Sequence, residues 1–107
     1  MSVESDIEVP GSPRFALGEL IVDDDVHDVL AMSLQSLAAL LRRHENADFG
    51  DVTQELRQRN DRAVSAGYWI KSLYRLPEGT TVIGVRTNAQ RTETHVRVEW
   101  DPPQGLL

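Results

Sequence analysis

The chain has 107 residues, a net charge of -6 and no cysteine. The length suits one domain and is too short for two, and the lack of cysteine excludes disulfides, thiolate metal ligands and cysteine nucleophiles. The negative charge argues against a general duplex-DNA binder and favours either simple solubility or a partner with a basic surface. No apolar run approaches the roughly 20 residues of a membrane span, so we expect a cytoplasmic protein.

The sequence divides into an arm, a domain and a tail. Residues 1–13 combine acids, Ser, Gly and two prolines, which predicts a flexible arm and no signal peptide. Residues 14–101 carry the periodic apolar pattern of a single α+β domain. Two prolines then stop the last strand, so residues 102–107 form a tail.

The first half of the domain predicts helices. Residues 17–22 are apolar enough for a short strand that ends at an acidic run. This run lacks the spacing of a calcium-binding loop and suits a helix N-terminus, where backbone N–H groups favour negative charge. Apolar residues at three- and four-residue steps through residues 24–45, Leu34 among them, are helical. They form two helices with a tight corner if the second is capped by Ser33 or Ser36.

A turn and a third helix follow. Residues 44–50, HENADFG, are rich in turn formers, and Phe49 among them is expected to fill the core from the loop side. Asp51 or Thr53 begins a polar helix that ends at Gly67.

From residue 68 the apolar period changes to two, which indicates strands. Residues 68–76, 80–87 and 94–100 alternate in this way, and short turns separate them. The predicted fold class is therefore α+β. Two or three N-terminal helices pack on a C-terminal three-stranded antiparallel meander, with the short N-terminal strand as an optional addition.

Several short motifs follow one another along the sequence in a characteristic order. They are a Leu-Gly strand, an Arg-His helix end, an Asp-Phe-Gly turn, a helix with a central Asn, a Ser-x-Tyr strand and a Thr-rich hairpin. This order resembles a family of small bacterial proteins carried on plasmids, phages and other mobile elements. The matching residues, between about 15 and 98, are Leu17, Gly18, Arg43, His44, Ala47, Asp48, Phe49, Gly50, Asn60, Ser72, Tyr74, Thr87, Ala89, Arg91, Thr92 and Thr94.

The resemblance implies a role rather than a reaction. Phe49 stands where the family has Trp, and Asn88 and Gln90 stand where it has acids, so any cation site of those acids is lost here. No enzymatic activity of the family can be assigned to this protein by resemblance. The association with mobile elements implies a role in host takeover or in countering bacterial defence systems. The residues expected to be structural are His44, Phe49, Gly50, Asn60 and Tyr74.

The three histidines are the main candidates for chemistry. His44 and Asp48 would form a His–carboxylate pair if the helix end curls back, and Ser65 or Ser72 would then have to supply a nucleophile. We favour the alternative, in which His44 caps the helix C-terminus and hydrogen-bonds in the turn. The spacing of His27, His44 and His95 matches no zinc motif. We therefore expect no catalytic residue, no metal, no cofactor and no enzymatic activity.

An acidic surface is the first candidate for binding. Its carboxylates would mimic nucleic-acid phosphates for a basic partner, whereas the alternative use of these acids is helix capping. The acids concerned are Asp23, Asp24, Asp25, Asp48 and Asp51.

The arginine-rich hairpin is the second candidate. Arg86, Arg91 and Arg97 accompany several threonines, and Arg86 and Arg97 are expected on one face of the sheet. With Tyr68, Trp69 or Tyr74 nearby, such a face suits RNA or single-stranded DNA. The alternative is cross-strand pairing with Glu93 and Glu99.

The sequence therefore predicts a non-catalytic protein-binding module. The sharper hypothesis is an inhibitor of a bacterial defence complex, such as a CRISPR or restriction effector, that acts through its acidic surface. The alternative is a small nucleic-acid-associated regulator that uses the hairpin. In the first case the partner is a protein with a basic surface, and nucleic acid is not a direct ligand.

Overall fold

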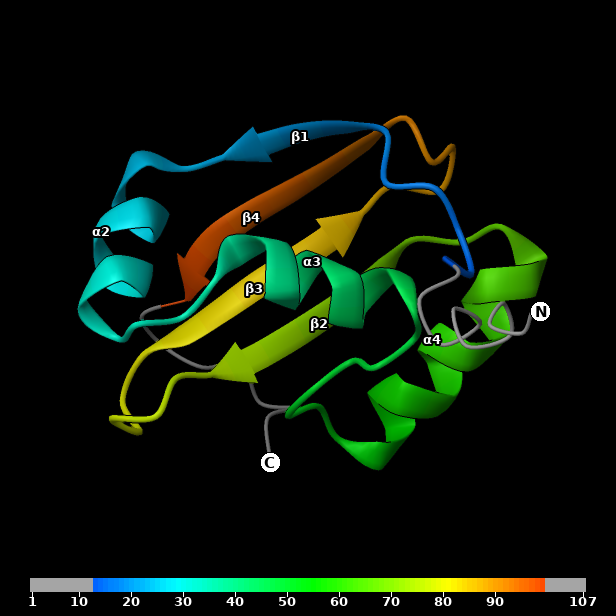
Figure 1. Ribbon diagram of the computed structural model, residues 1–107. Coiled ribbons are helices and arrows are strands. Elements are labelled where there is room, and N and C mark those ends of the chain that lie inside the picture. Colours follow the sequence, from blue (N-terminus) through cyan, green and yellow to red (C-terminus); the bar gives the residue numbers. More distant parts are fainter. Residues whose placement is uncertain (1–12, 100–107) are drawn as a thin grey trace, which may run out of the picture.

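The computed structural model describes residues 13–99, so the expected arm, apart from Pro13, and the expected tail lie outside the described residues. The described elements are three helices and four strands (Figure 1), and the α+β class is confirmed. They are β1 (Glu19–Val22), α2 (Asp24–Met32), α3 (Leu37–Glu45), α4 (Gln54–Ala66), β2 (Ile70–Arg75), β3 (Val82–Thr87) and β4 (Glu93–Glu99). None of these helices is long and apolar enough to cross a membrane.

The four strands form one mixed sheet in the order β1-β4-β3-β2. β2, β3 and β4 are antiparallel neighbours, as expected, but β1 joins the sheet beside β4 and runs parallel to it. The predicted three-stranded antiparallel sheet is therefore wrong in its strand count and in its purely antiparallel character, because β1 adds a fourth, parallel strand. A parallel neighbour needs a long crossover, and neither the two-residue period nor a turn signal in the sequence marks such a pairing.

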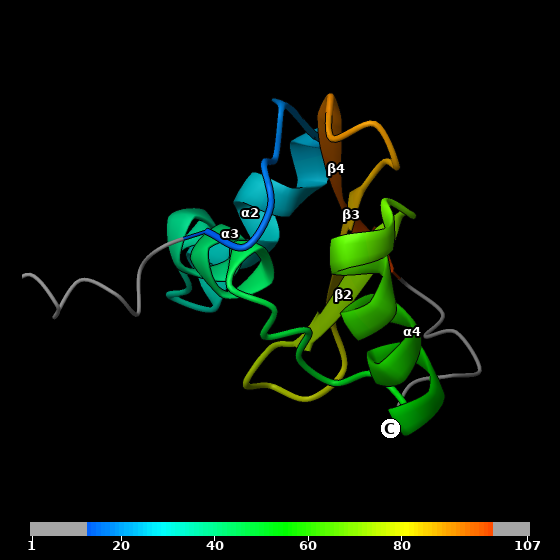
Figure 2. The ribbon, with the colours of Figure 1, turned by 90° about the vertical axis from the view of Figure 1, so that its right-hand side faces the viewer.

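α2 and α3 cover one face of the sheet (Figures 1 and 2). The tight corner between them is confirmed, because the Ser36 hydroxyl accepts a hydrogen bond from the Ala39 N–H and begins α3. One exception to the predicted apolar stripe is Leu34, which lies in this corner and is 91% exposed. The main core lies between these helices and the sheet and consists of Val26, Leu30, Leu40, Leu41, Tyr74, Leu76, Ile83, Val85, Val96 and Val98.

A second core cluster lies beside β2, where α4 runs along the sheet. α4 begins at Thr53, whose hydroxyl accepts from the Leu56 N–H, and ends at Gly67, as predicted. Phe49 is fully buried in this cluster, which confirms that it fills the core from the loop side. Its buried neighbours are Phe15, Val52, Ala63, Ile70, Leu73 and Val82.

The outer edge of β2 is closed by hydrogen bonds. The Asn60 side chain donates to the Lys71 carbonyl (2.8 Å) and accepts from the Lys71 N–H (3.2 Å), so the structural role expected of Asn60 is confirmed. Two residues further along, Leu73 donates to the Phe49 carbonyl and accepts from the Asp51 N–H. Main-chain groups that would otherwise face solvent or another chain are therefore satisfied within the molecule.

Gly50 allows the loop to approach β2 this closely. Its φ is +76°, and a Cβ atom there would lie 2.3 Å from the Leu73 carbonyl oxygen and 2.5 Å from the Tyr74 ring. Only glycine fits both the left-handed backbone and the close contact. The turn that the sequence singled out is thus a structural joint between α3 and the sheet.

Candidate functional site

His44 is fully buried and lies at the centre of a polar chain. Its Nδ1 lies 2.6 Å from the Ser72 hydroxyl, and its Nε2 lies 2.9 Å from the Thr87 hydroxyl. Thr87 contacts the Thr94 hydroxyl at 2.6 Å, and Thr94 donates to the Leu17 carbonyl. The expected cap within the turn is therefore wrong, because α3 points this ring at the sheet.

The positions of the protons in this series of hydrogen bonds follow from the Leu17 carbonyl at its end. The Leu17 carbonyl can only accept, so Thr94 donates to it, Thr87 donates to Thr94, and His44 Nε2–H donates to Thr87. Nδ1 is then free to accept from Ser72. Burial, together with the charge of Arg91, lowers the pKa of His44 to about 3, so the ring is neutral at pH 7.

The arrangement of His44 and Ser72 resembles a base with its nucleophile, but both side chains are fully buried. A substrate cannot reach the buried Ser72. Asp48 takes no part in this series of hydrogen bonds, because it pairs with Arg43 instead. The chain of hydroxyls instead satisfies polar groups inside the core, where an unpaired donor or acceptor costs about 1–3 kcal/mol.

Asp48 is engaged by its own turn. Its carboxylate accepts from Arg43 Nε at 2.7 Å and Nη2 at 3.2 Å, and from the Gly50 N–H at 3.3 Å. The bond from Arg43 holds the pKa of Asp48 below its ordinary value. The Arg43 guanidinium also lies 4.5 Å from the centroid of the Tyr74 ring, and the Tyr74 hydroxyl donates to the Asp48 carbonyl.

Two further acids of the predicted acidic surface also have partners within the molecule. The Asp51 carboxylate accepts from the Arg75 N–H at 2.8 Å, and Asp23 Oδ1 lies 2.8 Å from His95 Nε2. Asp24 and Asp25 lie in the first turn of α2 and are exposed, as is Asp28 one turn later. Among the acids of the predicted surface, Asp24 and Asp25 are thus exposed without a described ion pair or hydrogen-bond partner, whereas Asp23, Asp48 and Asp51 are engaged within the molecule.

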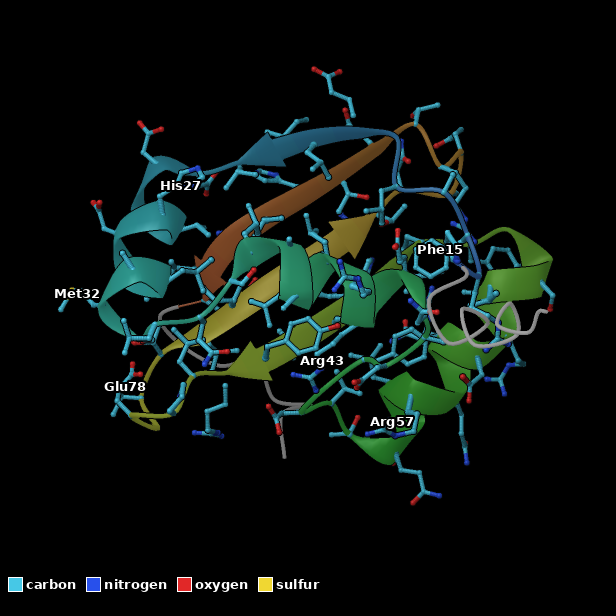
Figure 3. All side chains as sticks on the ribbon, viewed as in Figure 1. Phe15, His27, Met32, Arg43, Arg57 and Glu78 are labelled. Carbon is cyan, nitrogen blue, oxygen red and sulfur yellow. The ribbon has the colours of Figure 1, made fainter. Side chains whose placement is uncertain are left out.

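Exposed apolar side chains gather in the same segment, residues 20–34. Leu20, Ile21, Met32 and Leu34 are four of the five large apolar residues that are exposed within residues 13–99. Met32 projects from the outer end of α2, away from the sheet (Figure 3). The sequence pattern placed Leu34 on the apolar stripe because Leu34 continues the apolar period of α2. The helix ends before it and the chain turns there, and no signal in the sequence marks Leu34 as exposed.

The structure separates the three hairpin arginines. The Arg91 guanidinium donates to the carbonyls of Ala63, Tyr68 and Asn88 and lies 5.3 Å from the centroid of the Phe15 ring. It therefore ties the β3–β4 turn to the end of α4. Arg86 and Arg97, in contrast, are exposed.

Arg86 and Arg97 share the sheet face opposite α2 and α3, as the two-residue period predicts. The threonines and Tyr74 expected beside them are on the other face: Thr87, Thr94 and Tyr74 are buried. Trp69, one of the aromatic residues expected near the arginines, is beside them: Trp69 and Lys71 line a hollow in this face together with Arg86 and Arg97.

The described residues include no cluster of three or more His, Asp or Glu side chains that would hold a metal ion. Two surfaces remain: the segment of residues 20–34, which is acidic and apolar, and the sheet face with Arg86, Arg97, Lys71 and Trp69. Both are suited to binding. Comparisons of the chain with protein-family models, with curated proteins and with solved structures give no match.

Proposed function

We propose that this protein is a non-catalytic protein-binding module that docks through the surface of residues 20–34. The observation that carries the proposal is Leu34. Its side chain is 91% exposed, and its φ of +56° is a left-handed conformation that costs a non-glycine residue about 1–2 kcal/mol. A leucine held in this conformation and exposed to water contributes nothing to the core, so a contact outside the chain accounts for it.

Met32 strengthens this argument. It is 85% exposed and only two residues from Leu34. Large apolar side chains exposed together on a small protein mark interaction surfaces, and the buried centre of an interface is usually apolar. Met32 and Leu34 would fill such a centre.

The charge of the same segment defines the partner. Residues 20–34 contain four aspartates and neither lysine nor arginine. A partner with an apolar pocket and a basic rim complements this surface, and the charge would speed its association. The narrower hypothesis is inhibition of a CRISPR or restriction effector. It is supported by the resemblance to mobile-element proteins and by the basic surfaces of effectors that bind nucleic acid.

The experiment has two stages. The tagged protein captures its partner from a bacterial lysate, and the purified partner is then titrated with variants by calorimetry. Leu34→Gly removes the side chain but relieves the left-handed strain, so the stability changes by less than about 1 kcal/mol. If Leu34 is a hot spot of about 2 kcal/mol, this variant binds roughly 30-fold more weakly.

Charge reversal supplies the matched control. Asp28→Lys and Asp61→Lys both reverse an exposed aspartate in the interior of a helix, the first on α2 and the second on α4. We expect only Asp28→Lys to weaken binding. Wild-type affinity in both the Leu34→Gly and the Asp28→Lys variants, with the fold intact by circular dichroism, would refute docking through residues 20–34.

A further inference from the structure

The sheet face opposite α2 and α3 has a hollow of about 610 Å³. Trp69, Lys71, Arg86, Arg97 and Gln90 contribute to its lining. This volume lies within the range of sites for small ligands, about 300–1,000 Å³. Met32 and Leu34 do not line the hollow, although Asp23 contacts its lining residue His95, and the hollow is not needed for the protein-binding function proposed above.

The strand register brings the cations together. Lys71 on β2 lies directly opposite Arg86 on β3, and Arg97 on β4 lies opposite Gly84, two residues before Arg86. Side chains at such positions share one face and lie about 5–8 Å apart. Three positive groups from three strands thus face one hollow.

Trp69 holds Arg86 in place. The Arg86 guanidinium lies 4.9 Å from the centroid of the indole ring, and Arg59 lies 3.8 Å from the same ring. No described acid lies within ion-pair distance of Arg86. An exposed, unpaired guanidinium that stacks on an aromatic ring is ready to contact an anion or a flat base.

Glu99 is the main opposing charge. Its side chain is only 13% exposed and lies 3.4 Å from Lys71 and 3.9 Å from Arg97. Gly84 leaves the space for it, since a Cβ there would meet the carboxylate at 2.5 Å. Glu93 is the other acid of the lining, so with Arg59 beside the indole the surroundings of the hollow carry more positive than negative charge.

The net charge of the chain does not contradict a cationic face. Four of the six net negative charges come from residues outside the described part, namely Glu4, Asp6, Glu8 and Asp101, where no lysine or arginine occurs. Four more acids lie in residues 20–34. The net charge of the chain is therefore no measure of the charge on the described lining, which Asp23 of residues 20–34 touches at His95.

We infer that this hollow binds single-stranded nucleic acid. Arg86, Lys71 and Arg97 would contact phosphates, while a base would stack on the Arg86 guanidinium or the exposed part of Trp69. Aromatic and guanidinium planes next to cations are the features by which proteins bind single strands without reading their sequence. An acidic peptide would use the cations but gain nothing from the stacking groups, so the single strand is the better match.

The test uses the full-length protein with Trp100→Phe, which leaves Trp69 as the only tryptophan. Fluorescein-labelled oligothymidylate and oligouridylate of about ten nucleotides are titrated by anisotropy, starting at about 50 mM salt, and unlabelled oligomers are followed by Trp69 fluorescence. Three phosphate contacts predict that log K falls with log salt with a slope of about -2. Comparison of the two oligomers distinguishes DNA from RNA as the preferred strand.

The variants locate the contacts. Arg86→Ala should weaken binding and reduce the slope by about 0.7, whereas Arg42→Ala, which removes an exposed charge on α3, should bind as the parent does. Glu99→Gln should bind more tightly, because it releases Lys71 and Arg97. Three results would overturn the inference: no saturable binding at about 50 mM salt, equal losses in the Arg86 and Arg42 variants, or equally effective competition by oligoglutamate.

Discussion

The buried histidine makes stability depend on pH in a range where few other groups titrate. We consider the variant His44→Gln, which keeps a polar side chain of similar length but cannot gain a proton. In the wild type the ring is neutral and its two nitrogens lie against Ser72 and Thr87. A proton on Nδ1 would displace the hydrogen that Ser72 donates to that nitrogen, and the buried Ser72 hydroxyl would have to turn to another acceptor.

The sign and size of the effect follow from two pKa values. In the unfolded chain the pKa of His44 is about 6.5, and in the native state burial lowers it to about 3. As the pH falls below about 6.5, the unfolded chain gains a proton that the native state cannot take, so stability falls until the pH approaches 3. Between pH 7 and pH 5 the loss amounts to about 2 kcal/mol, from about 1.4 kcal/mol per unit of pKa difference.

The carboxylates contribute in a different range. Arg43 holds the pKa of Asp48 below its ordinary value of 3.8, so the stability from this pair is complete above about pH 4 and is lost only as the pH falls further. Asp48 therefore adds little to the change between pH 7 and pH 5, and the difference between the wild type and His44→Gln isolates the part that comes from His44.

The assay is urea unfolding followed by circular dichroism at pH 7 and pH 5. The wild type should lose about 2 kcal/mol of unfolding free energy between the two. His44→Gln should be less stable at pH 7 but should show little further loss at pH 5. The control His27→Gln, at an exposed position of α2, should keep the wild-type difference. A wild type equally stable at both pH values, or an undiminished loss in His44→Gln, would refute a neutral buried ring.

Three further predictions concern the turn and the edge it closes. Phe49→Ala should lower the unfolding free energy by about 3–5 kcal/mol in urea, because the ring is fully buried, and Phe49→Leu should cost clearly less. Asn60→Ala leaves the N–H and carbonyl of Lys71 unpaired and should cost about 2–3 kcal/mol, while the Lys71 amide should exchange with deuterium faster. Gly50→Ala should lower the melting temperature more than Gly67→Ala, since added atoms at Gly67 meet nothing within 4 Å whereas at Gly50 they strike β2. A smaller shift for Gly50→Ala would contradict the close approach.

Local signals in the sequence predicted the elements well. Ser36 and Thr53 were each one of two candidate caps, beside Ser33 and Asp51, because a hydroxyl or carboxylate before an apolar period satisfies the first N–H groups of a helix. The antiparallel neighbours β2, β3 and β4 were predicted because short turns leave little choice of pairing. Phe49 was predicted in the core because an aromatic ring among turn residues has no favourable place in water.

Long-range features were not predictable in the same way. The pairing of β1 with β4 joins residues more than 70 positions apart, so no local pattern records it. His44 was assigned to its turn because its partners, Ser72 and Thr87, are distant in sequence and come together only in the sheet. Arg91 looked like a surface arginine, yet its partners are main-chain carbonyls, which any sequence supplies.

The closed edge of β2 has a consequence for how copies of this protein can meet. At the other edge of the sheet, the N–H and C=O groups of Leu20 and Val22 point away from β4. They make no hydrogen bond with the described residues. The described domain therefore has one open sheet edge: a further strand can pair with β1, and none can pair with β2. Two copies that met edge to edge at β1 would consume both open edges, so growth would stop at a pair and would not continue into a fibre. Asn60 and the Gly50 turn would in this way protect against polymerisation as well as stabilise the fold.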